Sequence, residues 1–290
     1  NRRVIMRALS PAVVRKLEQD FVEDAQRLVD EVLAQGEIEA VAAIAEAFPT
    51  RVFPRAVGIK QPDARKLVDY GAMVFNAIGP DNPLRQRIMA KAPEIVPWIN
   101  EQCDRSRLTE DGIGATIYAA ADTGEIGEAE AGMLIRSLLS AGVDTTVSGI
   151  GSALWCLAQY PEQFQQLRAD PSRRAGPAFE EALRFCTPVQ AFFRTAADAT
   201  TVGGVEIEEG TKILCVLGAA NRDAQKFESP DEFMIDRDTR GHLALGVGVH
   251  SCVGQIIARA EGRAILQALA ERVSNIEFAG EPVWRANNSM

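Results

Sequence analysis

One cysteine of the chain, Cys252, ends a glycine-rich loop and directly precedes a segment with helical periodicity. A thiolate in that position is stabilised by free backbone N–H groups and by the positive end of the helix dipole. The glycines of the loop, Gly246 among them, permit left-handed backbone and let a flat ligand approach closely. The two histidines of the chain, His242 and His250, both lie within ten residues of Cys252. A soft, anionic sulfur that faces an open plane suits the iron of a haem.

Three other uses of these residues remain open at this point. The first is an ordinary buried cysteine after a glycine turn. The second is a zinc site formed by His242, His250 and Cys252, although the sequence offers neither a nearby fourth ligand nor paired Cys-x-x-Cys spacing. The third is a nucleophile pair of Cys252 and His250, which lie too close in sequence to orient each other simply.

A second group of reactive side chains lies within a long apolar segment. Residues 127–159 are expected to form one helix, and Asp144 is the acidic group in its apolar middle. The hydroxyl of Thr145 can bond to the carbonyl of Ala141, four residues earlier, and open the helix locally. Ala141 and Gly142 carry no bulky side chain, so a ligand can lie against the backbone there. A solvated helix face is the alternative, and the apolar flanks of the run argue against it.

Two charged motifs follow the long helix. Glu181 and Arg184 are spaced i, i+3, so they share a helix face and can form an ion pair. Arg194 ends a strand-like run in which Phe192 shares its face by alternation. A guanidinium at that position is a suitable bidentate partner for a carboxylate. A surface salt bridge and a solvated arginine at a strand end are the alternatives for these two motifs.

These four motifs, in this order, resemble those of the cytochrome P-450 family. Residues 245–254 read Leu-Gly-Val-Gly-Val-His-Ser-Cys-Val-Gly, similar to the family pattern aromatic-Gly-x-Gly-x-His/Arg-x-Cys-x-Gly. Residues 181–184 (Glu-Ala-Leu-Arg) resemble the family's Glu-x-x-Arg helix, and residues 141–146 (Ala-Gly-Val-Asp-Thr-Thr) resemble its oxygen-activating segment. Leu245 departs from the pattern, because the family has a phenylalanine whose ring packs beside the thiolate. A shifted redox potential of the iron is the expected consequence.

The resemblance implies a role for each motif. Cys252 is expected to be the axial ligand of a haem b iron, Asp144 to deliver protons, and Thr145 to hold the activated oxygen. The expected members of a buried ion-pair scaffold are Glu181, Arg184 and Arg237. The other groups expected to contact haem, several of them at its propionate edge, are His242, His250, Arg194, Gly246 and Ala141.

The reaction implied by the resemblance is a monooxygenation. A haem-thiolate enzyme of this kind inserts one oxygen atom from dioxygen into an organic substrate, with electrons from a ferredoxin and its reductase. The detailed sequence resembles bacterial members that oxidise para-substituted benzoates, so hydroxylation or O-demethylation of a small aromatic substrate is expected. The residues expected to face the substrate are Ser137, Ser140, Ala141, Phe75, Ile78, Val189 and Phe192. Plain core packing is the alternative for the last four of these.

Three rival functions are weighed against this one. A peroxide-driven enzyme would normally lack the acid–alcohol pair that Asp144 and Thr145 provide. A haem-binding fragment without turnover is the main alternative, because the chain is shorter than a full member of the family and looks truncated at both ends. A helical interaction protein without a cofactor would require all four motifs to be accidental.

Helices are expected to position most of these residues. The strand-like run at 190–217, with tight turns at Gly203-Gly204 and Glu209-Gly210, predicts a small β region. The fold class is therefore mainly α with a small β region, an incomplete cytochrome P-450 fold in a single domain over residues 1–290. The helices that periodicity and end signals predict cover residues 11–35, 38–57, 63–78, 85–105, 111–121, 127–159, 161–169, 176–186 and 254–273.

Composition limits the partners of the chain. Its net charge is -9 and it has no long basic run, which argues against nucleic acid as a partner. It has no apolar stretch of about 18 residues, so no membrane span is expected. The five cysteines are scattered, which indicates no disulfide framework and favours a reducing, cytoplasmic setting. A soluble, acidic protein is expected.

Overall fold

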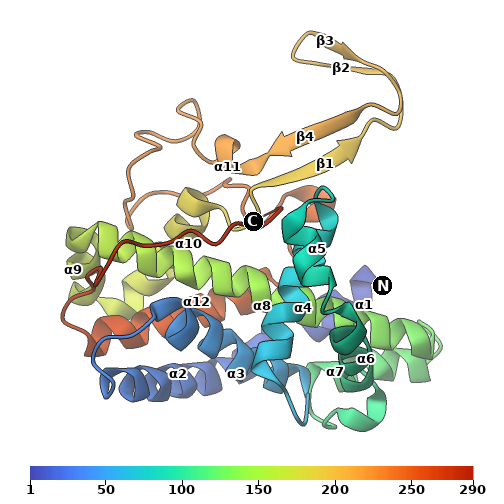
Figure 1. The fold of residues 1–290 in the computed structure, drawn as a ribbon, viewed down its shortest axis with the longest axis horizontal. Helices are drawn as coiled ribbons and strands as arrows, with labels where there is room; N and C mark the ends of the chain where they lie inside the picture. The colour runs from blue at the N-terminus through green and yellow to red at the C-terminus, as the bar shows by residue number, and fades with distance from the viewer. Residues whose placement is uncertain (290) are drawn as a thin grey trace.

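The computed structural model describes residues 1–289, most of which lie in helices. The longest helix, α8 (Glu128–Gln159), crosses the whole body of the molecule, as Figure 1 shows. The helices before it are α1 (Arg2–Ala8), α2 (Pro11–Leu33), η1 (Val41–Glu46), α3 (Ala47–Val57), α4 (Ala64–Ile78), α5 (Pro83–Met89), α6 (Ala92–Gln102), η2 (Arg105–Arg107) and α7 (Ile113–Asp122). The helices after it are α9 (Pro161–Ala169), α10 (Pro171–Cys186), α11 (Leu217–Ala220), η3 (Gly248–His250) and α12 (Gln255–Arg272). Among residues 1–289, no helix is both long and apolar enough to cross a membrane.

Helix α8 is packed on several sides because its own apolar residues lie on several of its faces along most of its length. With 32 residues it extends about 48 Å at 1.5 Å per residue. Its start is capped by the Glu130 carboxylate, which accepts the N–H of Gly127 at 2.8 Å, and Pro161 follows its end. Helices α3, α4, α7, α10 and α12 pack against it. One part of its surface stays open, however, since Ser137 and Ala141 are exposed.

The last helix, α12, packs against both α2 and α10. Ile265, Leu266 and Leu269 of α12 are buried, as is Phe21 of α2. Burying one such side chain contributes roughly 1.5–3 kcal/mol. Because α12 begins just after Cys252, this packing holds the cysteine in place relative to the helical body.

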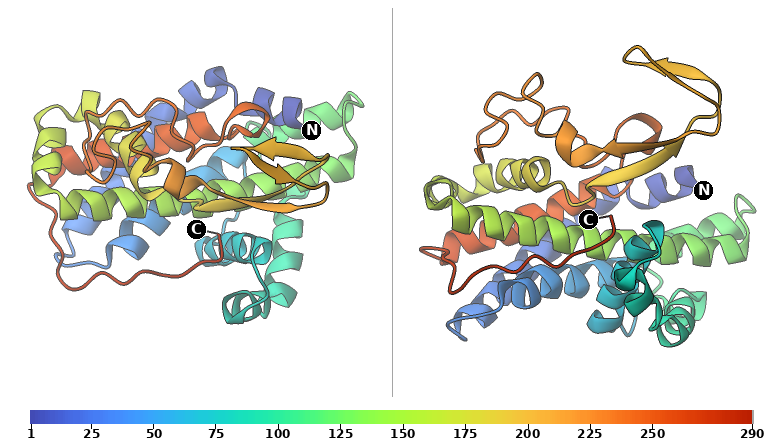
Figure 2. Two further views of the ribbon diagram at one scale, coloured as in Figure 1. Left: turned by 90° about the horizontal axis from the view of Figure 1, so that it is seen from above. Right: turned by 45° about the horizontal axis from the view of Figure 1, so that its top comes forward.

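Two antiparallel strand pairs form the β region. Strand β1 (Ala191–Thr195) pairs with β4 (Lys212–Val216), and β2 (Thr200–Val202) pairs with β3 (Val205–Ile207). Gly203 and Gly204 make the tight turn that the sequence predicts, with φ of 59° and 82° in the left-handed region. Figure 1 and the right-hand view of Figure 2 show β2 and β3 projecting beyond the helices.

The structure confirms the predicted fold class, but some helix boundaries differ. The helix predicted over residues 85–105 is two helices, α5 and α6, because Pro93 lacks the N–H that would bond to the carbonyl four residues earlier. Helix α10 begins at Pro171 rather than near residue 176, since the Asp170 side chain caps its first turn. Helix α1 is not among the predicted helices.

Candidate active site

The loop that ends at Cys252 follows a path that requires glycine. Gly246 and Gly248 have φ of 68° and 60°. A Cβ atom at Gly246 would lie 2.5 Å from the carbonyl oxygen of His250, so a larger residue cannot be placed there without a shift of the backbone. The N–H of Cys252 donates to the carbonyl of Leu245 at 2.7 Å and closes the loop. The loop therefore delivers the cysteine to the start of α12.

The surroundings of the Cys252 sulfur act on its pKa in both directions. Burial raises the pKa of the thiol above its usual value, and the N–H of Gly254 and the positive charges of Arg259 and Arg2 oppose that rise only in part. Arg2 comes from α1 and donates from Nη2 to the carbonyl oxygen of Ser251 at 2.7 Å. Arg2 could not be predicted from the sequence, because no local pattern joins the first helix to a loop near the other end of the chain. The N–H of Gly254 and the charges of Arg2 and Arg259 act in favour of the thiolate, and a metal cation on the sulfur would deprotonate the thiol outright.

The two histidines lie in different surroundings. His250 is exposed. His242 places Nε2 2.9 Å from Oε2 of Glu180, and its Nδ1 accepts the N–H of Ala244 at 3.2 Å. Both ring nitrogens of His242 therefore have protein partners, and its contact with a haem propionate stays a prediction. In residues 1–289 no three His, Cys, Asp or Glu side chains are grouped to hold a metal ion, so the structure does not bring together the residues of the zinc alternative at Cys252.

An open strip of α8 consists of Ser137, Ala141 and Thr145, which are exposed or half-buried. The Thr145 hydroxyl donates to the Ala141 carbonyl at 2.7 Å, the bond that the spacing predicts. Ser140 does not belong to this strip. It is buried, and its hydroxyl donates to the Ser137 carbonyl at 3.0 Å, while its place against a substrate stays a prediction.

The glycine next to the open strip serves a different purpose from the predicted one. A Cβ atom at Gly142 would lie 2.4 Å from the ring of Phe53 in α3. Gly142 therefore permits close packing of α3 on α8 rather than access for a ligand. Thr146 is buried as well, and its hydroxyl donates to the Gly142 carbonyl at 2.9 Å.

Asp144 is a sheltered carboxyl on α8. Burial raises the pKa of Asp144 to about 7, the negative charge of Glu46 adds to the rise, and Arg285 opposes it. Its Oδ2 is buried and has no hydrogen-bond partner within the part of the chain that the structure describes. Asp144 lies against α4, where a Cβ atom at Gly71 would lie 2.6 Å from the Cβ atom of Asp144. A carboxyl with a pKa near neutrality can both release and regain a proton at working pH.

The predicted ion-pair residues meet inside the molecule. Arg184 is fully buried and donates from Nε and Nη2 to the two carboxylate oxygens of Glu181 at 2.7 and 2.8 Å. Its Nη1 also donates to the carbonyls of Asn221 and Pro230, each at 2.9 Å. Arg237 donates from Nε to Oε1 of Glu181 at 3.1 Å. The structure thus brings Glu181, Arg184 and Arg237 together and ties α10 to the segment after α11.

The remaining predicted residues lie on β1, on α4 and in the segment between α10 and β1. Arg194 is exposed on β1, with its guanidinium 5.7 Å from the ring centre of Phe192, so the two share a face as alternation predicts. Phe75 and Val189 are 7% and 9% exposed, which is the burial expected of core residues. Ile78 is 50% exposed.

Comparisons with known proteins agree with this geometry. The model of the family "Cytochrome P450" matches residues 177–276. The chain is 49% identical over 290 residues to cytochrome P450 CYP199A2 of Rhodopseudomonas palustris, which covers 100% of this chain and 70% of that protein. It is 34% identical over 288 residues to cytochrome P450 144 of Mycobacterium tuberculosis, covering 98% of this chain and 66% of that protein.

Solved structures give the same result. The crystal structure of P450BioI with a ligated acyl carrier protein superposes with a TM-score of 0.89 at 27% identity, covering 99% of this chain and 75% of that one. The ligand-free structure of Mycobacterium smegmatis CYP164A2 superposes with a TM-score of 0.88 at 28% identity, again covering 99% and 75%.

The fold and the cysteine loop define a haem protein, and the residues present fit that cofactor. Cys252 offers a sulfur donor, the open strip of α8 carries no bulky side chain, and Arg194 and His250 are exposed groups able to pair with carboxylates. The chain belongs to the cytochrome P450 family. Its cofactor is accordingly haem b, and its class of enzyme is the haem monooxygenases.

Proposed function

We propose that Cys252 is the axial ligand of the haem iron and that the chain's site inserts one oxygen atom from dioxygen into a small aromatic substrate. The observation that carries the proposal is the glycine-shaped loop that places this cysteine at the start of α12. When bound, haem supplies reductive activation of dioxygen, which an axial thiolate assists by donating electron density to the iron. In the overall balance, substrate, dioxygen, two electrons and two protons give hydroxylated substrate and water.

Two residues of α8 would manage the protons of this reaction. Thr145 holds its hydroxyl at the open strip through the bond to the Ala141 carbonyl. Asp144, whose pKa is raised to about 7 chiefly by burial, is suited to exchange protons with solvent and to supply them to that hydroxyl. A peroxide-driven enzyme would need no such pair, which is why we favour a reaction driven by external electrons.

Other residues would orient the cofactor and the substrate. Arg194 and His250 are exposed cationic or hydrogen-bonding groups suited to the haem propionates. Ala141 leaves the surface of α8 free for a flat ligand, and Ser137 adds a hydroxyl for a polar substrate group. The half-buried ring of Phe192 supports an aromatic substrate, and the sequence resemblance favours para-substituted benzoates.

The electron donors would be a ferredoxin and its reductase, as for the bacterial members that the sequence resembles. A turnover assay tests these proposals with two adjacent threonines. Thr145 and Thr146 each donate to the carbonyl four residues earlier, but only Thr145 lies on the open strip. We expect Thr145→Ala to divert electrons from product to hydrogen peroxide and water, while Thr146→Ala keeps the wild-type ratio of product to electrons consumed.

The assay supplies dioxygen, ferredoxin, reductase and 4-methoxybenzoate, whose methoxy carbon would be hydroxylated and then released as formaldehyde. It measures formaldehyde and hydrogen peroxide against electrons consumed. Equal loss of coupling in both variants would contradict the role of the open strip. A wild-type chain that holds haem but forms no product from any benzoate would contradict the proposed reaction and favour haem binding without turnover.

A further inference from the structure

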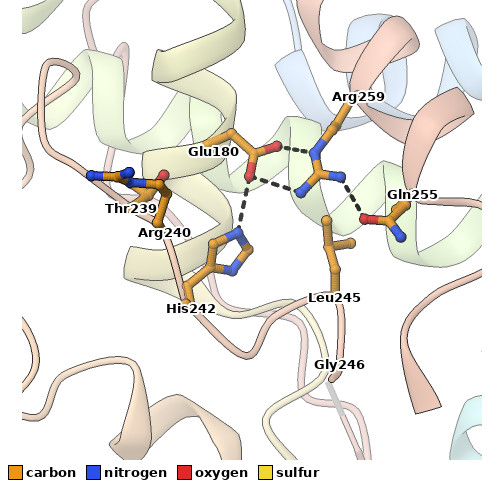
Figure 3. Close-up of a pocket in the computed structure, with 9 residues that line it drawn as sticks. Glu180, Thr239, Arg240, His242, Leu245, Gly246, Gln255 and Arg259 are labelled. Carbon is orange, nitrogen blue, oxygen red and sulfur yellow. Dashed lines mark hydrogen bonds and ion pairs between the residues drawn. The ribbon is translucent and has the colours of Figure 1, made fainter. Parts of the chain in front are cut away.

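Helix α10 carries two consecutive glutamates that point to different parts of the molecule. Glu181 belongs to the buried ion-pair cluster described above. Glu180 has no place in that cluster and is not used by the proposed reaction. Figure 3 shows its carboxylate between the ring of His242 and the guanidinium of Arg259.

The contacts of Glu180 reach both sides of the cysteine along the chain. Its Oε2 lies 2.9 Å from Nε2 of His242, in the loop before Cys252. Its Oε1 and Oε2 accept from Nε and Nη2 of Arg259, on α12 after Cys252, at 2.5 and 3.2 Å. A single carboxylate thus ties α10, the loop and α12 together.

Both partners of Glu180 pass the restraint on by further hydrogen bonds. The Nδ1 atom of His242 accepts the N–H of Ala244 at 3.2 Å, so the tautomer with its hydrogen on Nε2 satisfies both contacts. Ala244 adjoins Leu245, whose carbonyl accepts the N–H of Cys252 at 2.7 Å. On the other side, Nη1 of Arg259 donates to Gln255 at 2.6 Å, in the first turn of α12.

We propose that Glu180 is a positioning residue for Cys252, acting through His242 and Arg259 to set where the loop and the start of α12 hold the sulfur. The inference rests on the proposed role of Cys252 as the iron ligand. Groups that orient a metal ligand from outside its coordination shell typically change metal affinity or activity 10–100-fold when they are replaced.

The charge state and the setting of Glu180 suit this role. Burial raises its pKa, but the hydrogen bonds from His242 and Arg259 outweigh burial and bring the pKa of Glu180 to about 2. The carboxylate is therefore ionised throughout the working range of pH, and the restraint is permanent rather than a switch. Glu180, His242, Leu245 and Arg259 also line one open cavity of about 270 Å³, so the ion pair lies at the surface of the cavity that borders the loop.

The chain offers a matched ion pair that lacks this connection. Arg263 lies one turn further along α12 and pairs with Glu18 of α2 at 3.2 Å. Arg259 and Arg263 are similarly exposed, at 40% and 43% of their side chains. A general loss of one ion pair from α12 would affect both pairs alike, whereas a positioning role belongs to Glu180 and Arg259.

The experiment compares Glu180→Gln and Arg259→Lys with Glu18→Gln and Arg263→Lys in the haem-loaded chain. One measurement is the rate of haem transfer to excess apomyoglobin, and the other is hydrogen exchange of the amides in residues 241–254. We expect Glu180→Gln to lose haem roughly 10-fold faster than wild type and to exchange faster within that segment. The conservative Arg259→Lys keeps the positive charge but not the pair of N–H donors to the Glu180 carboxylate, so it should show a smaller change in the same direction.

The two control variants should match wild type in both measurements. Two substitutions of His242 give a further comparison. His242→Gln keeps an N–H donor for the carboxylate of Glu180, and His242→Leu does not. The inference is overturned if Glu180→Gln behaves like Glu18→Gln, or if His242→Leu retains haem as well as His242→Gln. A wild-type chain that binds no haem would instead refute the proposed function, and exchange in residues 241–254 would still report whether Glu180 holds the loop.

Discussion

Replacing Asp144 with asparagine should stabilise the protein near neutral pH. The pKa of Asp144 is raised from 3.8 to about 7, chiefly by burial. Between these two values the unfolded chain has released a proton that the folded chain still holds, so the stability of the fold decreases as the pH rises. The rise of about three units corresponds to about 4 kcal/mol of lost stability at a pH above the folded-state pKa. Asparagine does not titrate, so the stability of the variant does not decrease for this reason as the pH rises.

Urea unfolding at about pH 5 and about pH 8 measures the effect. The stability of Asp144→Asn relative to wild type should increase by about 2–3 kcal/mol between those two values, because most of the loss in wild type falls in this window. Asp111→Asn is the control, since Asp111 is exposed in the turn before α7. A difference between Asp144→Asn and wild type that stays constant from pH 5 to pH 8 would refute the reasoning.

Three further substitutions test the packing around the site. Arg184→Ala leaves the buried carboxylate of Glu181 without its bidentate partner, so a loss of about 3–5 kcal/mol is expected in denaturant unfolding. Gly142→Ala puts a methyl group 2.4 Å from the Phe53 ring, and should lower the free energy of unfolding by roughly 1–3 kcal/mol. Gly246→Ala places a Cβ atom 2.5 Å from a backbone carbonyl at a left-handed position, so the variant should fold but lose haem retention, as measured by haem transfer. Wild-type stability in the first two variants, or wild-type retention in the third, would contradict these accounts.

Much of the fold could be predicted because local signals determine it. Pro11 after a serine starts α2 where the sequence indicates, and the apolar run between residues 127 and 159 corresponds closely to α8. Gly203 and Gly204 have the positive φ that a tight turn needs. Local signals failed at α10, where Gly176 and Pro177 suggest a helix start but the helix already runs from its cap at Asp170.

The site was predictable only where its residues are close in sequence or belong to a recognisable motif. Glu181 and Arg184 are three residues apart, and the hydroxyl bond of Thr145 spans one helical turn. The partners of Glu180 lie 62 and 79 residues away in sequence, so no local pattern could reveal them. Ser140 shows a related limit, because one residue of offset on a helix turns a side chain from the open strip into the core.

The absorption spectrum of the reduced, carbon-monoxide-bound chain tests the bond between Cys252 and the haem iron most directly. Wild type loaded with haem should show the Soret band of a thiolate-ligated iron. Cys252→Ala should lose that band, while Cys215→Ala, which replaces a half-buried cysteine on β4, should keep it. Retention of the thiolate band in Cys252→Ala, or its absence from haem-loaded wild type, would contradict the account.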